Sequence, residues 1–133
     1  MKPIVTSVEE LYARKEPTGE MILDEVVSYL HRTRIITAMD LALLMDVNKR
    51  QLYGAISLLV GLTLGEFITR WRLLQARELL HAEPFSSMTV RADRLNAVAR
   101  RCGWRSGRVL LAVARRYRFD PEAAPSPQVQ QTS

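Results

Sequence analysis

One short pattern occurs twice in this chain, and it limits the possible folds more than any other feature. Each copy reads as a short helix, a tight turn and a second helix, because apolar residues recur at helical spacing on both sides of the turn. The first copy has Leu41-Ala42, then Met45-Asp46-Val47-Asn48, then Leu52 and Ile56; the second has Val98-Ala99, then Cys102-Gly103-Trp104-Arg105, then Leu110 and Ala114. The repeat predicts an all-α fold with two helix-turn-helix subdomains.

A long helix is predicted between the two copies. Leu64 to about His81 would span roughly 27 Å at a rise of 1.5 Å per residue. Gly61 suits the left-handed position that ends the preceding helix, and Thr63 followed by Glu66 three residues later has the spacing of a capping box. Apolar side chains cover more than one face of the segment, so we expect this central linker helix to contact both subdomains.

Breakers and composition divide the chain into five predicted parts. They are an N-terminal arm (1–20), a first helix-turn-helix subdomain (21–62), the linker helix (63–82), a second helix-turn-helix subdomain (83–121) and a disordered tail (122–133). The arm has a short helix at about Val8 to Arg14, which either packs on the body or reaches for a partner. The tail is rich in Ala, Pro, Ser and Gln and has nothing to bury.

Local signals place the helices of the first subdomain. Thr37 and Asn48 are predicted N-caps because a Thr or Asn oxygen accepts a hydrogen bond from a free backbone N–H in the first turn. Leu41, Leu44 and Met45 are predicted to form the inward side of the short helix that follows Thr37. The turn to the next helix falls at Asp46, Val47 and Asn48.

Positive charge is concentrated in the second half of the chain. The whole chain carries a net charge of +5 with an isoelectric point near 9.9. Between Arg91 and Arg118 there are nine arginines and a single acid, Asp93, so this window holds +8 and the remainder −3. A solvated helix face is the ordinary reading of a charge run. Because the planar arginine fork suits phosphates and guanine edges, the run favours contact with nucleic acid.

Four phrases of the sequence lie in one order between Ile22 and Pro121, over most of the chain. They are GLTLGEFITRWRL (61–73), ARELL (76–80), VARRCGW (98–104) and FDP (119–121). Together they resemble the DNA-binding domain of the AraC/XylS transcription regulators. The resemblance implies a homeodomain-like, all-helical fold of about seven helices, two recognition helices in successive major grooves, and a cytoplasmic bacterial protein. Because the resemblance covers most of the 133 residues, we expect a regulator without a separate ligand-sensing domain.

The outward faces of the two second helices give the candidate DNA-binding residues. Near the N-terminus of such a helix, side chains reach base edges in the major groove, whereas residues further along suit phosphate contact. We expect Arg50, Arg105 and Arg108 to approach bases. The full set of candidate DNA-binding residues is Lys49, Arg50, Tyr53, Ser57, Arg105, Ser106, Arg108, Arg115 and Arg116.

Departures from the family pattern keep a second hypothesis open. Gly54 stands in the first recognition helix, where it costs about 0.5 to 1 kcal/mol of helix stability, and Arg118 or Phe119 stands where a glycine is usual. Apolar residues replace polar ones at Leu58, Leu59, Val60, Val109, Leu111 and Ala112. Such surfaces suit protein contact better than DNA reading. The alternative is therefore an adaptor for protein interaction or dimerisation that binds DNA weakly or without sequence preference.

The sequence favours a binding protein over an enzyme. Paired carboxylates, a nucleophile beside a base and a phosphate-cradling glycine loop are not apparent, and neither a cofactor nor a metal is predicted. Cys102 is expected to be a small buried hydrophobe, and His31 and His81 to lie at the surface or at helix ends. A membrane segment is not expected. Double-stranded DNA is the predicted partner, with RNA polymerase, another regulator or a second copy of the chain left open.

Overall fold

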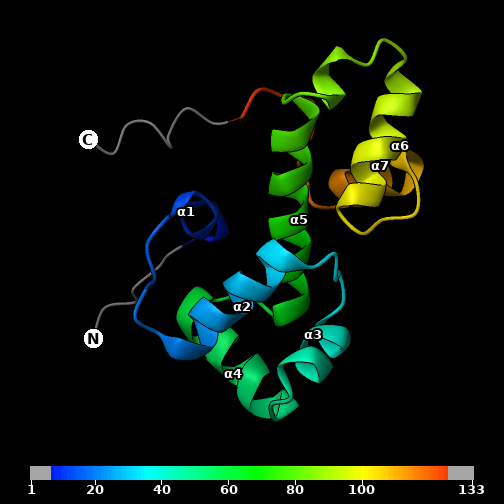
Figure 1. Ribbon diagram of the computed structural model, residues 1–133. Helices are drawn as coiled ribbons and strands as arrows, with labels where there is room; N and C mark the ends of the chain where they lie inside the picture. The colour runs from blue at the N-terminus through cyan, green and yellow to red at the C-terminus, as the bar shows by residue number, and fades with distance from the viewer. Residues whose placement is uncertain (1–6, 126–133) are drawn as a thin grey trace. The chain divides into compact units, whose positions relative to one another are not determined.

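The computed structural model describes residues 7–125 of the chain. These residues form seven α-helices and one short 3₁₀ helix, and they contain no strand (Figure 1). The α-helices are α1 (Val8–Ala13), α2 (Met21–Arg32), α3 (Ala38–Met45), α4 (Lys49–Val60), α5 (Leu64–Leu80), α6 (Arg91–Arg101) and α7 (Gly107–Arg116); the 3₁₀ helix is η1 (Phe85–Ser87). The predicted all-α class and helix number are confirmed.

The chain divides into two compact units. Unit 1 is Met1–Trp71 and unit 2 is Arg72–Ser133. Helix α5, which matches the predicted long helix within one residue, begins in unit 1 and ends in unit 2. Each unit has its own buried residues, so each is described separately below.

In unit 1, the short helix α1 contributes to the core. Ser7 caps it by accepting a hydrogen bond from the backbone of Glu10, and its apolar residues Val8 and Leu11 are buried. The arm was predicted either to pack on the rest of the protein or to reach for a partner. Residues 8–13 of the arm pack within unit 1.

Aromatic rings surround Trp71, which is completely buried. The Tyr12 and His31 rings meet the indole edge to face, with centroids 4.9 and 5.1 Å away, and the Phe67 ring lies tilted at 6.2 Å. T-shaped pairs of this kind are favoured by the charge distribution of aromatic rings. The cluster joins α1, α2 and the first half of α5 within unit 1.

Asp24 fixes the turn that leads into α2. Its carboxylate accepts hydrogen bonds from the Thr18 backbone N–H (2.8 Å), the Thr18 hydroxyl (2.7 Å) and the Gly19 N–H (3.1 Å). Burial opposes ionisation, but these hydrogen bonds and the nearby Arg14 charge lower the pKa of the Asp24 carboxyl below its usual value.

The predicted helix ends are confirmed. Thr37 and Asn48 accept hydrogen bonds from the Asp40 and Gln51 backbones, and Gly61 adopts a left-handed conformation at the end of α4, with a φ of 83°. At the start of α5, the Thr63 hydroxyl accepts from the Glu66 N–H, and the Thr63 N–H donates to the Glu66 carboxylate, both at 3.1 Å.

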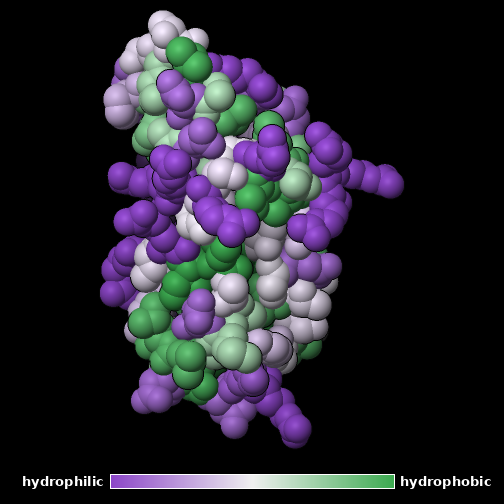
Figure 2. All heavy atoms as spheres, turned by 90° about the vertical axis from the view of Figure 1, so that its right-hand side faces the viewer, coloured by the Kyte–Doolittle hydropathy of each residue, from purple (hydrophilic) through white to green (hydrophobic). Residues whose placement is uncertain are grey.

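The predicted inward side of α3 was wrong at one position. Leu41 and Met45 are buried as expected, but Leu44 is 47% exposed and Ala42 is buried instead. The reason is that nearly every residue of α3 is apolar, so the sequence pattern does not distinguish the inner side. Leu43 and Met39 are also exposed, and hydrophobic side chains lie at the surface in the lower part of Figure 2, over α3.

In unit 2, α6 and α7 pack closely at a glycine (Figure 1). A β-carbon added to Gly107 would lie 2.8 Å from the Leu95 β-carbon and 3.0 Å from its backbone carbonyl carbon. The Asn96 side-chain oxygen accepts a hydrogen bond from the Gly107 N–H at 2.7 Å. Cys102 and Trp104 are buried at the turn between the two helices, and η1 lies between α5 and α6.

The prediction of a disordered tail from residue 122 is wrong where that tail begins. Glu122, its first residue, makes a two-pronged ion pair with Arg91 at the start of α6, with distances of 2.6 and 2.8 Å. This pairing lowers the pKa of the Glu122 carboxyl. Residues 126–133 of that tail lie outside the described residues.

Candidate nucleic-acid interface

The two copies of the sequence pattern have matching cores. Five corresponding positions of each copy, ten residues in all, are buried. The pairs are Leu41 and Val98, Ala42 and Ala99, Met45 and Cys102, Leu52 and Leu110, and Ile56 and Ala114. The repeat is therefore a repeat of local structure as well as of sequence.

The turns of the two copies share their backbone hydrogen bonds. Asp46 N–H donates to the Leu43 carbonyl, and its counterpart Gly103 donates to Arg100, both at 3.2 Å. The next N–H donates to the Ala42 carbonyl at 3.5 Å in the first turn and to the Ala99 carbonyl at 2.9 Å in the second turn. Asp46 and Gly103 both have positive φ angles, 54° and 104°. The second turn then has one residue more before its helix begins.

This match pairs two arginines. Asn48 caps α4 and Ser106 caps α7, so Arg50 and Arg108 are each the second residue of the helix after the turn. Both side chains are exposed. A helix cap and turn therefore hold one arginine in the same local position in each unit.

The other candidates on α4 also face solvent. Lys49, Arg50, Tyr53 and Ser57 are all exposed, as the helical spacing predicted. Leu58, one residue further, is 83% exposed. The outward face of α4 therefore begins basic and ends apolar.

The candidates of unit 2 are exposed with one exception. Arg105, Arg108, Arg115 and Arg116 are exposed. Ser106 is half-buried, and its hydroxyl accepts a hydrogen bond from the Val109 N–H at 3.4 Å as the cap of α7. Ser106 thus has a structural task whatever else it contacts.

Two arginines of the basic window have partners within unit 2. Arg91 pairs with Glu122, and Arg94 donates to the Met88 carbonyl at 2.6 Å. Outside the window, Arg77 lies over the Phe119 ring at 4.8 Å. Apart from the paired Arg91, the exposed arginines of α6, α7 and their flanks are Arg100, Arg101, Arg105, Arg108, Arg115, Arg116 and Arg118. We refer to these seven residues as the arginine surface.

Charge differs between the two units. Unit 1 has 8 basic and 9 acidic residues, a net charge of −1, whereas unit 2 has 11 basic and 5 acidic residues, a net charge of +6. Exposed large apolar residues show the opposite distribution among the described residues. Those of unit 1 are Met21, Met39, Leu43, Leu44, Tyr53 and Leu58; that of unit 2 is Val90. An anionic partner is therefore attracted to unit 2 more than to unit 1.

Sequence reasoning missed the two residues that position α7. Asn96 and Gly107 bring α7 against α6 through a hydrogen bond and a close backbone approach. A serine N-cap followed by glycine was visible in the sequence, but the partner of that glycine lies eleven positions earlier and has no local signature.

Residues 7–125 contain no group of three or more His, Cys, Asp or Glu side chains placed to hold a metal ion. Burial raises the pKa of the Cys102 thiol to about 12, against the lowering effect of the Arg72 and Arg101 charges. No single helix in the described residues has both the length and the apolar character to cross a membrane.

Comparisons with known protein families, curated proteins and solved structures found no match to this chain.

Proposed function

We propose that this chain is a DNA-binding transcription regulator of the AraC/XylS type. In this proposal the two helix–turn–helix copies are homeodomain-like DNA readers, α4 and α7 are the recognition helices, and they enter successive major grooves. The observation that carries the proposal is the exposed arginine at the second position of each of these helices, Arg50 and Arg108, after turns with the same hydrogen bonds.

The chemistry of the exposed residues supports this assignment of roles. Arginine donates two parallel hydrogen bonds to the O6 and N7 atoms of guanine in the major groove, and residues at the N-terminal end of a recognition helix reach these edges. Arg115 and Arg116 lie at the far end of α7, where contact with phosphates is expected. Unit 2, with its higher charge, supplies most of the phosphate attraction.

A salt titration tests whether the chain binds DNA through phosphates. A duplex is first selected from a random pool on the full chain, and its affinity is measured by fluorescence anisotropy at several salt concentrations. If about six phosphates are neutralised, the logarithm of the affinity falls with the logarithm of salt concentration with a slope near −5. A flat salt dependence, or no preference over competitor duplex, would contradict the proposal.

Single substitutions separate base reading from phosphate contact. Arg50→Ala and Arg108→Ala should each cost about 1 to 3 kcal/mol and relax the preference at one base pair, whereas Arg115→Ala should weaken all duplexes alike. The matched control is Arg32→Ala, because Arg32 is exposed but lies on α2, with its guanidinium 4.6 Å from the centre of the Tyr29 ring. An equal loss of DNA affinity in all four variants would show that only the net charge of the chain matters.

A second candidate function is an adaptor for protein interaction built on the same scaffold. The observation that favours it is the set of exposed apolar residues in unit 1, above all Leu58 at 83% and Leu43 at 74%. Apolar side chains at a binding surface gain free energy when a partner removes them from water.

Charged substitutions distinguish the adaptor from the DNA reader. Leu58→Glu and Leu111→Glu should abolish self-association or partner binding if the adaptor function is correct, as measured by analytical ultracentrifugation. Under the DNA-reading proposal, Arg50→Ala and Arg108→Ala impair function and Leu58→Glu leaves the salt slope near its original value. Circular dichroism of each variant verifies that its helices are intact.

A further inference from the structure

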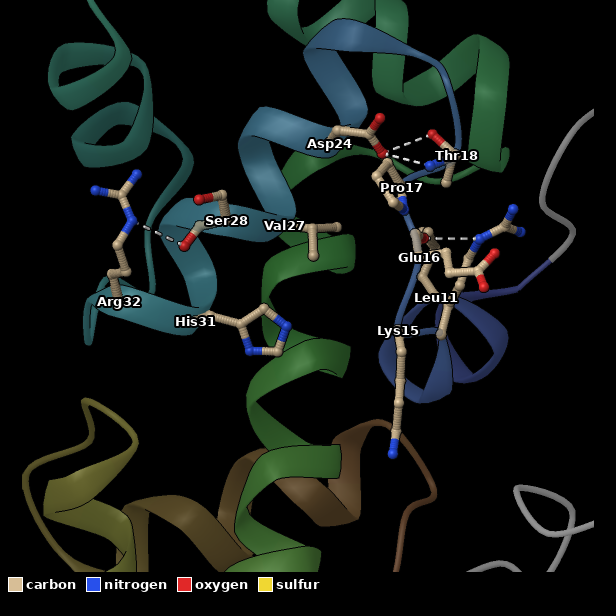
Figure 3. A pocket seen from close by; sticks show the side chains of 11 residues that line it. Leu11, Lys15, Glu16, Pro17, Thr18, Asp24, Val27, Ser28, His31 and Arg32 are labelled. Carbon is tan, nitrogen blue, oxygen red and sulfur yellow. Dashed lines mark hydrogen bonds between the residues drawn. The ribbon is translucent and has the colours of Figure 1, made fainter.

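Unit 1 contains an open pocket between α2 and the segment that follows α1. Its volume is about 330 Å³, near the lower end of the range for small-molecule sites. Figure 3 shows its two walls, α2 on one side and residues 14–18 on the other. None of the residues expected to bind DNA lines it.

Apolar and cationic groups share this pocket. Leu11, Pro17 and Val27 provide apolar surface, and Lys15 and His31 provide nitrogen atoms. In Figure 3 the His31 ring extends from the end of α2 towards the pocket, and the Lys15 side chain descends from the opposite wall. The combination of an apolar wall with a few polar groups is typical of sites for small organic molecules.

The polar groups of the pocket differ in how far they are already satisfied. The Asp24 carboxylate accepts three hydrogen bonds from Thr18 and Gly19. Among residues 7–125, no side chain or backbone group forms a hydrogen bond or ion pair with the Lys15 ammonium or the His31 ring nitrogens. Glu16 also lines the pocket, but the cationic residues Arg14, Lys15 and Arg32 outnumber the carboxylates of Glu16 and Asp24, and an ammonium group suits an anion.

We propose that this pocket binds a small organic anion with an apolar body, such as an aryl-substituted or short-chain carboxylate. The carboxylate lies between Lys15 and His31, and the apolar body covers Leu11 and Val27. This site is distinct from the surfaces of α4 and α7, so it adds a small-molecule ligand to a chain for which only DNA or protein partners were expected.

Trp71 provides an internal reporter of occupancy. The His31 ring, which lines the pocket, lies 5.1 Å from the buried Trp71 ring. An anion that draws His31 towards the pocket changes the surroundings of this indole. Because Trp104 is the second tryptophan of the chain, a Trp104→Phe variant leaves Trp71 as the sole source of tryptophan emission.

The first experiment titrates the full-length Trp104→Phe chain with 4-phenylbutyrate. We expect a saturable change in Trp71 emission with a dissociation constant of about 1 mM, as befits a ligand of about a dozen heavy atoms. Isothermal titration calorimetry on the unaltered chain should give the same constant. The uncharged amide of the same compound is the control, and an equal response to it would overturn the proposal.

Substitutions within the pocket make the test specific. Lys15→Gln should weaken binding about tenfold, since a hydrogen bond to a charged group is lost. Glu16→Gln should strengthen binding, because Glu16 also lines the pocket and repels an anion. Lys49→Gln, the same change of side chain, should have little effect, because Lys49 is exposed but does not line the pocket. Unchanged affinity in Lys15→Gln would overturn the proposal, and so would equal loss in Lys49→Gln.

Discussion

Gly54 and Gly107 both lie in the second helix of a repeat, but their surroundings are opposite. An added β-carbon at Gly107 would be 2.8 Å from the Leu95 side chain and close to its backbone, whereas nothing lies within 4 Å of one at Gly54. One glycine is needed for close packing of α6 and α7. The other only adds flexibility to the unfolded chain.

These surroundings predict opposite effects of alanine at the two positions. Gly107→Ala should destabilise the protein by about 1 to 3 kcal/mol, because the backbone of α6 has to move away. Gly54→Ala should stabilise it by about 0.5 to 1 kcal/mol, as alanine does in an open helix. Urea unfolding of the two variants provides the measurement. A stabilised Gly107→Ala variant would mean that α6 and α7 are not held together at this point.

At Asp24, the lowered carboxyl pKa has a consequence for stability against acid. A carboxyl whose pKa is lower in the folded state than in the unfolded state stabilises the fold above its unfolded pKa, about 3.9, and this contribution is lost as the pH falls through the folded pKa. Asp24→Ala should therefore reduce stability by about 1 kcal/mol at pH 7, since hydrogen bonds to a charged acceptor are lost.

The difference between Asp24→Ala and the unaltered protein should then shrink below about pH 4, where the carboxyl becomes protonated. Urea unfolding between pH 7 and pH 3 measures this difference. Glu25→Ala is the control, because Glu25 is the exposed neighbour of Asp24 on α2. A gap that stays constant over the whole pH range would show that the Asp24 charge has no part in stability.

Among the elements, α5 has the most complete start signal. Thr63 and Glu66 exchange two hydrogen bonds there, and the helix supplies buried residues to both halves of the chain. Thr63→Ala should cost about 1 kcal/mol of unfolding free energy, because an N–H at the helix start loses its acceptor. Thermal unfolding measures this loss, and Thr63→Ser, which keeps the hydroxyl, should restore most of it. Equal losses in both variants would assign the effect to the methyl group instead.

The elements that could be predicted from the sequence are those with local signals. The caps at Thr37, Asn48 and Thr63 and the left-handed Gly61 depend on neighbours within four positions, and all are confirmed. The inner side of α3 could not be predicted, because a helix that is apolar on all sides has no alternation of apolar and polar residues to mark its buried face.

The exposed candidates on α4 and α7 could also be predicted, because an amphipathic helix has a clear outer face. The ion pair of Arg91 with Glu122 and the close contact at Gly107 could not be predicted. These depend on partners 31 and 11 or 12 positions away along the chain, and no short-range pattern specifies such partners. Whether the outer faces read DNA depends on a partner and stays a prediction.

For the molecule as a whole, the division of charge separates two kinds of surface. Unit 2 carries the arginine surface and a net charge of +6, and unit 1 carries most of the exposed apolar residues and a net charge of −1. Attraction of a polyanion therefore has to come mainly from unit 2. Replacing Arg115 and Arg116 by alanine should reduce the salt slope of DNA binding by about 2, because both are expected to contact phosphates. The same change of charge at Arg14 and Arg32 should leave the slope unaltered.

The buried Cys102 thiol, with its pKa near 12, can report how often unit 2 opens to solvent. Only a thiolate reacts with an alkylating reagent, so in the closed molecule this sulfur is both shielded and in the wrong protonation state. Alkylation of Cys102 therefore requires that unit 2 opens to water. Mass spectrometry of the alkylated fraction over time measures the rate of this opening. Gly107→Ala, which loosens the contact between α6 and α7, should increase the rate of Cys102 alkylation, whereas Gly54→Ala should not.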